Sequence, residues 1–157
     1  MNKFLIAAFS GLLAATAAPA AMAEASQPVE LKGDVKVDKL VIENGHEKHV
    51  LVAPNVVVPG DKLVFATSYR NNGSVAVKDF VVTNPIPEGV MLASQGAELL
   101  DVSVDGGKSW GKLAQLKVSD TAGPRAAQAS DVTHIRWVLP VLAPGAKGTL
   151  SYNAIVR

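Results

Sequence analysis

The chain of 157 residues contains no cysteine, few aromatic residues and almost no excess of charge of either sign. Without cysteine, disulfides and thiolate metal sites are excluded, so the fold must depend on a hydrophobic core. Aromatic residues make up 5% of the chain, and this suits a thin core of small aliphatic side chains between two sheets. No segment has the apolar period of an amphipathic helix, so the composition favours an all-β fold.

The long apolar run of the chain lies at its N-terminus, where Lys3 precedes apolar residues from Phe4 to Ala18. Ala21-Met22-Ala23 follows as an Ala-x-Ala cleavage site, so residues 1–23 are predicted to be a cleaved signal peptide. A retained membrane anchor is the alternative, but the run is shorter than the roughly 20 residues of a typical span. We therefore expect export to the periplasm or cell surface, with no membrane span after cleavage.

The predicted signal peptide contains one of the 15 basic residues and none of the 14 acidic residues. The rest of the chain is therefore formally neutral, and this argues against nucleic acid and anionic lipid as partners, because both need a basic surface. Low net charge also leaves self-association unopposed by repulsion.

Alternating apolar and polar residues predict strands along most of the chain after Gly33. Residues 24–33 are predicted to form a flexible N-terminus, and residues 34–157 a single β-sandwich domain of about 7–9 strands. The expected strands cover residues 35–42, 46–53, 63–71, 75–83, 90–93, 99–104, 110–118, 132–139 and 149–156. Asn44-Gly45 predicts a tight hairpin turn. The alternation of apolar and polar residues changes phase near Asp38, and this predicts a bulge. Pro140 is expected to end its strand. Residues 120–131 are expected to be a surface loop, in which Arg125 is a solvated charge.

Residues typical of turns lie between these strands, and they form the most distinctive pattern of the sequence. Proline presets φ at the second position of a turn and glycine accepts positive φ at the third, so Pro59-Gly60 and Pro144-Gly145 each predict the same turn before a strand. The full turn and strand signature consists of Pro59, Gly60, Asp61, Asn71, Gly73, Asn84, Pro85, Pro87, Gly89, Pro144 and Gly145.

This signature, over residues 52–156, resembles the bacterial and archaeal conserved-repeat family called "domain of unknown function eleven". The resemblance implies an Ig-like Greek-key β-sandwich in a secreted or surface protein. The chain departs from the family in having a single copy where tandem copies are usual, and Asn84 where Asp is common. The single copy argues against a long stalk.

Ser103, Asp105, Gly107 and Trp110 match the Ser-x-Asp-x-Gly-x-x-Trp pattern, which resembles the Asp-box hairpin of sialidase-type propeller blades. The carboxylate of Asp105 can accept backbone N–H groups of the turn, and Trp110 can pack beneath it. A propeller needs several blades and this chain has one motif, so we interpret the motif as a structural turn rather than a saccharide site.

Other candidate sites are weaker. His46, His49 and His134 are the candidate metal ligands, but residues three apart in a strand face opposite ways, so we expect neither a metal nor another cofactor. The sequence contains no nucleophile, phosphate-loop or dinucleotide motif, and the prediction is that the chain is not an enzyme.

We therefore expect an exported contact module that binds an unknown envelope protein or itself. Carbohydrate binding through an exposed Trp110 or Trp137 is one alternative, although both are expected to lie in the core. Self-assembly, in which residues 24–43 add a strand to a neighbouring copy, is the other.

Overall fold

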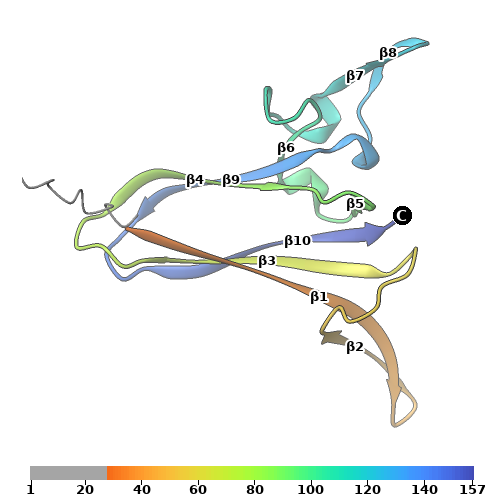
Figure 1. Ribbon diagram of the computed structural model, residues 1–157, viewed down its shortest axis with the longest axis horizontal. Helices are drawn as coiled ribbons and strands as arrows, with labels where there is room; N and C mark the ends of the chain where they lie inside the picture. Colours follow the sequence, from red (N-terminus) through yellow and green to blue (C-terminus); the bar gives the residue numbers. More distant parts are fainter. Residues whose placement is uncertain (1–27) are drawn as a thin grey trace, which may run out of the picture.

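The computed structural model describes residues 28–157 and shows an all-β sandwich with two projecting hairpins (Figure 1). The predicted all-β sandwich is therefore confirmed, whereas the predicted signal peptide and residues 24–27 lie outside the described residues. The sheets have the strand orders β2-β1-β3-β10-β5, β4-β9-β6 and β7-β8. The strands are β1 (Val29–Glu43), β2 (His46–Val52), β3 (Lys62–Asn71), β4 (Val77–Pro85), β5 (Val90–Leu92), β6 (Asp101–Ser103), β7 (Lys117–Asp120), β8 (Gly123–Ala126), β9 (His134–Leu142) and β10 (Lys147–Val156).

The core lies between the five-stranded and three-stranded sheets. Val102 and Ile135 of one sheet are fully buried and belong to the same cluster as Val37, Leu63 and Leu92 of the other. Around this aliphatic centre, Phe65 stacks on Tyr152 with ring centroids 4.9 Å apart, and Trp137 packs against the same tyrosine at 6.4 Å. The inward side chains of β3 and β10 are therefore the alternate residues that the sequence pattern predicts.

The two Pro-Gly turns occupy equivalent places at opposite ends of the antiparallel pair β3–β10. Before β3, the N–H of Gly60 donates to the carbonyl of Val156 (2.8 Å), and Val156 donates to Asp61 (3.0 Å). Before β10, the N–H of Gly145 donates to the carbonyl of Asn71 (2.8 Å). Asn71 in turn donates to Ala146 (2.9 Å). Each turn thus joins the beginning of one strand to the end of the other.

Asn71 links the loop between β3 and β4 to the end of β9, where the chain crosses back to β10. Its side chain is fully buried, and its Nδ2 donates to the carbonyls of Val75 and Leu142, each at 2.9 Å. Its Oδ1 accepts the N–H of Gly73 at 2.9 Å. A Cβ at Gly73 would lie 3.0 Å from Pro28, so the glycine allows the start of the described chain to pass closely. Four positions of the sequence signature therefore meet at one end of the sandwich, because Pro144-Gly145 also contacts Asn71.

The N-terminal strand differs from the sequence-based prediction in two ways. Residues 29–33 were expected to be flexible, but they begin β1, which pairs with β3 from Val29 to Asp38. The bulge expected near Asp38 is also wrong, since the register of β1 with β3 and with β2 is continuous. The change of phase reflects a change of neighbours instead, because after residue 38 β1 pairs with β2 alone.

The region between β5 and β9 departs most from prediction. Residues 110–118 were expected to be one strand, yet they make a single bridge, between Val102 and Gly111, then the short 3-10 helix η2 (Leu113–Gln115), and only residues 117 and 118 are extended, as the start of β7. Residues 120–131 were expected to be a loop, but they contain β8 and the 3-10 helix η3 (Ala129–Asp131). Another short helix, η1 (Ala97–Leu99), precedes β6, and no helix within residues 28–157 is long and apolar enough to cross a membrane.

Pro140 does not end its strand as predicted. β9 continues to Leu142 because β6 pairs with β9 only between His134 and Arg136, so the edge of β9 beside Pro140 needs no donor on that side. On the other side, Asp79 of β4 lies opposite the proline, and its φ of 49° is a left-handed value that is unusual for a non-glycine residue.

Candidate functional site

The structure brings the four residues of the Asp-box pattern together in one turn after β6. Oδ1 of Asp105 accepts the N–H groups of Lys108 (3.0 Å) and Ser109 (2.9 Å), and Oδ2 accepts the hydroxyl of Ser109 (2.6 Å). These bonds, led by the Ser109 hydroxyl, hold the pKa of Asp105 far below its usual range. Ser103 is fully buried and donates to Asp105 (2.7 Å) while accepting the N–H of Gly107 (2.8 Å). The carboxylate is therefore committed to holding the turn.

Trp110 closes this turn instead of presenting an open aromatic platform. Its Nε1 donates to the carbonyl of Gly107 (3.0 Å), and the guanidinium of Arg136 lies over its ring at 4.7 Å from the centroid. Nε of Arg136 is buried and has no hydrogen-bond partner among the described residues, so the indole face is a principal neighbour of this cation. Trp137 packs on Tyr152, so both indoles are half-buried and have contacts within the chain.

The three histidines are placed on different elements or faces. His46 and His49 lie three residues apart in the continuous strand β2, so they point to opposite faces, and His134 lies in β9. Nδ1 of His49 is 2.8 Å from Oδ1 of Asp38. Nδ1 of His134 is 3.1 Å from Oγ1 of Thr133. Within residues 28–157 no group of three or more His, Cys, Asp or Glu side chains could hold a metal ion.

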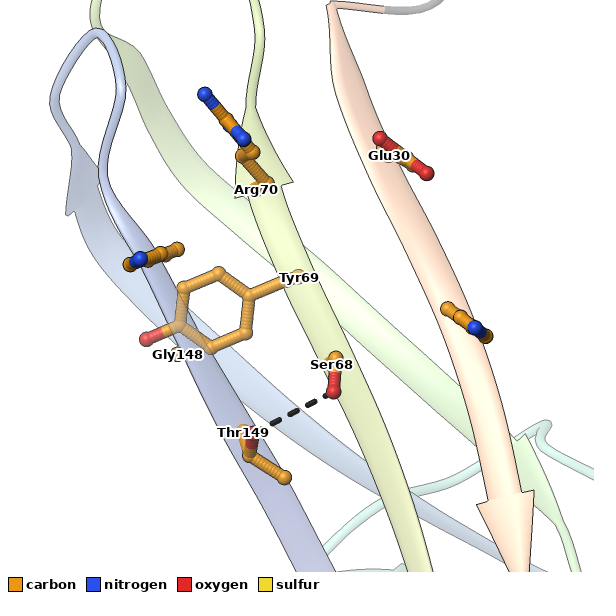
Figure 2. A pocket seen from close by; sticks show the side chains of 8 residues that line it. Glu30, Ser68, Tyr69, Arg70, Gly148 and Thr149 are labelled. Atoms are coloured by element: carbon orange, nitrogen blue, oxygen red, sulfur yellow. Dashed lines mark hydrogen bonds between the residues drawn. The ribbon is translucent and has the colours of Figure 1, made fainter.

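A shallow groove of about 570 Å³ crosses β1, β3 and β10 (Figure 2). The ring of Tyr69 reaches from β3 across β10 at Gly148, where a Cβ would collide with the phenol. The other lining residues are Glu30, Lys32, Ser68, Arg70, Lys147 and Thr149. Ser68 and Thr149 face each other with their hydroxyls 3.4 Å apart, and no carboxylate approaches either of them closely enough to activate it.

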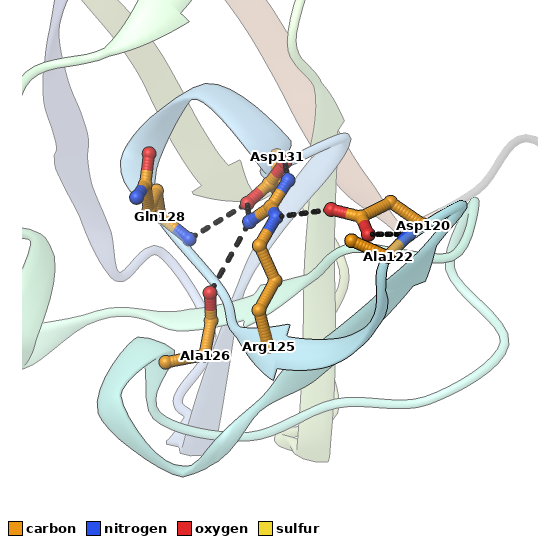
Figure 3. A network of polar contacts seen from close by, with 6 residues as sticks. All are labelled: Asp120, Ala122, Arg125, Ala126, Gln128 and Asp131. Atoms are coloured by element: carbon orange, nitrogen blue, oxygen red, sulfur yellow. Dashed lines mark hydrogen bonds and ion pairs between the residues drawn. The ribbon is translucent and has the colours of Figure 1, made fainter.

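A polar network stabilises the hairpin β7–β8, which we call the polar hairpin (residues 117–126). Nη1 and Nη2 of Arg125 donate to the two carboxylate oxygens of Asp131 at 2.7 and 2.8 Å, and its Nε donates to Asp120 at 3.0 Å (Figure 3). The guanidinium, together with the N–H of Gln128, lowers the pKa of Asp131 to about 2. The N–H of Ala122 first, and Arg125 second, lower the pKa of Asp120. Arg125 is therefore not the free solvated charge that the sequence suggested.

The second projecting hairpin carries apolar side chains that the sandwich does not cover. We call residues 39–52, which comprise the end of β1 and all of β2, the apolar hairpin. Figure 1 shows β1 curving away from the other strands, so that this hairpin lies apart from them. Its exposed aliphatic residues are Leu40, Val41, Ile42, Leu51 and Val52, and the loop after it adds exposed Val56, Val57 and Val58.

The register places three of these side chains on one face of the apolar hairpin. Leu40 and Ile42 are two residues apart in β1, and Leu51 stands opposite Asp38, two residues before Leu40. Val41 lies on the reverse face, beside the pair formed by Lys39 and Val50. Both faces thus expose apolar groups, which is unusual for a strand pair that packs on a core.

Sequence reasoning found the Asp-box turn but missed the two hairpins as sites. The consecutive run Leu40-Val41-Ile42 was the available signal, because a strand that puts apolar residues on both faces must be covered on both faces or project from the sheet. The Arg125 network had a weaker signal, since Asp120 and Asp131 flank the arginine at short range.

Comparison of the chain with protein-family models, with curated proteins and with solved structures found no match.

Proposed function

We propose that this chain is an exported, non-catalytic β-sandwich module that acts by contact with an envelope protein or with a second copy of itself, and that the apolar hairpin is its docking surface. The observation that carries the proposal is the group of aliphatic side chains exposed on a hairpin away from the core. Contiguous apolar surface of this kind is typical of protein–protein contact sites.

The exposure of individual side chains supports this interpretation. Ile42 is 77% exposed, and Leu40 and Leu51 on the same face are each 54% exposed. Burying such side chains against a partner would contribute about 25 cal/mol for each Å² of apolar surface removed from water. The same face also carries His49, opposite Leu40, and Asp38, opposite Leu51, and the side chains of these two residues are in contact at 2.8 Å.

A non-catalytic role is supported by the contacts of the carboxylates whose pKa values are lowered. Asp105, Asp120 and Asp131 have lowered pKa values because each accepts hydrogen bonds that hold a turn in place. Export rests on Lys3, the apolar run after it and the Ala-x-Ala site, and membership of the conserved-repeat family remains a prediction from the turn signature.

The proposal is tested by site-specific photo-crosslinking in intact cells. A photoreactive residue at position 42 should give a discrete protein adduct, and adding Leu40→Asp should reduce that adduct at least tenfold. The matched control is position 99, because Leu99 is as exposed as Ile42, at 77%, but lies in η1 away from the hairpin. Absence of an adduct from position 42, or an equal adduct from position 99, would contradict the proposal.

A further inference from the structure

The outer edge of β2 presents backbone groups that no other strand uses. β2 is the terminal strand of its sheet, and it pairs with β1 alone. Among residues 28–157 no further backbone hydrogen bond reaches β2 from its open side. An open edge of this kind is a template on which another strand can pair.

The turn of the hairpin determines which residues face this open edge. Asn44 and Gly45 both have positive φ, 53° and 80°, as in a two-residue type I′ turn, so the flanking residues Glu43 and His46 form a hydrogen-bonded pair. Hydrogen-bonded and non-hydrogen-bonded pairs alternate along an antiparallel ladder. The backbone N–H and C=O groups of Glu47, His49 and Leu51 therefore point away from β1.

The other edges of the two main sheets are less suitable for pairing. β5 and β6 have three residues each. β4 is longer, but Asp79 interrupts its extended conformation with φ of 49°, and Pro85 cannot donate. β2 has seven residues, no proline and no left-handed residue, so it is the edge best suited to accept a strand.

We infer that the occupant of this edge is β2 of a second copy of the chain, paired antiparallel about a two-fold axis at His49. This inference rests on the proposed function, since it names the occupant of the apolar hairpin. Among two-fold registers, only this one overlaps all seven residues of β2. It places His49 opposite His49, and Glu47 opposite Leu51 of the other copy, so that all three outward-facing residues of each copy are paired.

The outward-facing side chains can interact in this symmetric arrangement. Glu47 of one copy lies diagonally across from His49 of the other, at roughly 7–8 Å between Cα atoms, a spacing that long side chains on neighbouring strands can bridge. Leu40, Ile42 and Leu51 of the two copies lie on the same face of the combined sheet, and Glu47 and His49 of both copies lie between them. An isologous contact of this kind needs only one patch on each copy, and the formally neutral chain after the predicted signal peptide offers no net repulsion against it.

The absence of native cysteine allows the register to be tested with single cysteines. His49→Cys should form a disulfide dimer of the purified protein under mild oxidation, because the two cysteines face each other across the axis. Glu47→Cys alone and Leu51→Cys alone should remain monomeric, since identical residues are then about 13 Å apart along the strand. A mixture of these two variants should form the mixed dimer. Leu99→Cys, at a position exposed by 77%, measures random collision.

We expect the dimer yield of His49→Cys, and of the Glu47→Cys and Leu51→Cys mixture, to exceed that of Leu99→Cys at least tenfold. Equal yields would overturn the inference, and efficient dimerisation of Glu47→Cys alone would overturn the register. Leu51→Pro provides a measurement without oxidation. It removes an outward N–H and leaves the bonds to β1 intact, so sedimentation should show loss of the dimer. A dimer that persists in this variant also contradicts edge pairing.

The two proposals fail in different ways. If position 42 captures a different protein and the cysteine variants do not pair, self-pairing is rejected and the contact function stands. If position 42 captures nothing, neither another protein nor the chain itself, the proposed function is rejected.

Discussion

The apolar hairpin and the polar hairpin both project from the same sandwich, but they are stabilised in opposite ways. In the polar hairpin, Arg125 links Asp120 and Asp131 through hydrogen bonds of 2.7–3.0 Å, so its side chains satisfy one another. In the apolar hairpin, Leu40, Ile42 and Leu51 remain exposed on one face. The polar hairpin therefore satisfies its charges within the chain, whereas the apolar hairpin leaves aliphatic side chains in contact with water.

This difference separates two uses of a projecting strand pair. A hairpin tied down by a bidentate arginine has a fixed geometry and little apolar surface to bury, so it is suited to covering one side of its own domain. A hairpin with aliphatic side chains and an open edge offers both apolar area and unpaired backbone groups, which are the two sources of affinity in strand addition.

The largest expected effect tests whether the apolar hairpin really lies outside the core. Ile135→Ala should lower the free energy of unfolding by about 2–5 kcal/mol, because Ile135 is fully buried and its truncation leaves a cavity. Ile42→Ala, the same change on the apolar hairpin, should alter it by no more than about 0.5 kcal/mol. Urea denaturation of the monomeric protein measures both values. Similar losses in the two variants would mean that Ile42 belongs to the folded core.

A smaller effect compares two carboxylates, Asp131 and Asp38, each of which contacts one of the hairpins from outside it. Asp131→Ala should lower the free energy of unfolding by about 1–2 kcal/mol, because it removes the bidentate partner of Arg125 and leaves the N–H of Gln128 without its acceptor. Asp38→Ala removes only the contact with His49, whose side chain is 61% exposed, and should change it by at most about 0.5 kcal/mol. Chemical denaturation of both variants makes the comparison. A larger loss in the free energy of unfolding for Asp38→Ala than for Asp131→Ala would contradict this prediction.

The smallest expected effect is a loss of stability of the polar hairpin at acidic pH. The pKa of Asp131 is lowered from 3.8 to about 2 in the folded chain, so its stabilisation is complete above pH 3.8 and is lost as the pH falls towards 2. Asp120 is shifted in the same direction. Hydrogen exchange of residues 117–126, normalised to an unstructured peptide at each pH, should therefore become faster between pH 4 and pH 2. Asp131→Asn should weaken this pH dependence, and unchanged protection of the native hairpin down to pH 2 would contradict the assignment.

The turn chemistry of this fold could be predicted from sequence because it is local. Pro59-Gly60, Pro144-Gly145 and Asn44-Gly45 form turns where expected, since proline and glycine restrict or permit φ whatever surrounds them. The strand at Pro140 was mispredicted because a missing N–H matters only if a neighbouring strand needs it, and that depends on β6 being short.

The candidate site was less predictable than the fold. Asp105 lies within four residues of most of its partners, so its turn could be inferred from a short pattern. The buried side chain of Asn71 instead bonds to Leu142, 71 residues away, and no local pattern indicates that contact. The run Leu40-Val41-Ile42 indicated a strand with apolar residues on both faces, but whether those faces are covered depends on where β3 stops pairing with β1.

The sequence by itself determined that the chain alternates as strands, turns at defined proline and glycine positions, and has no cysteine to cross-link it. These properties depend on single residues and their immediate neighbours. Only the tertiary structure decided which alternating faces are covered, because burial depends on the sheet packed opposite. Sheet order therefore placed Ile135 in the core, left Ile42 in solvent and opened the edge of β2.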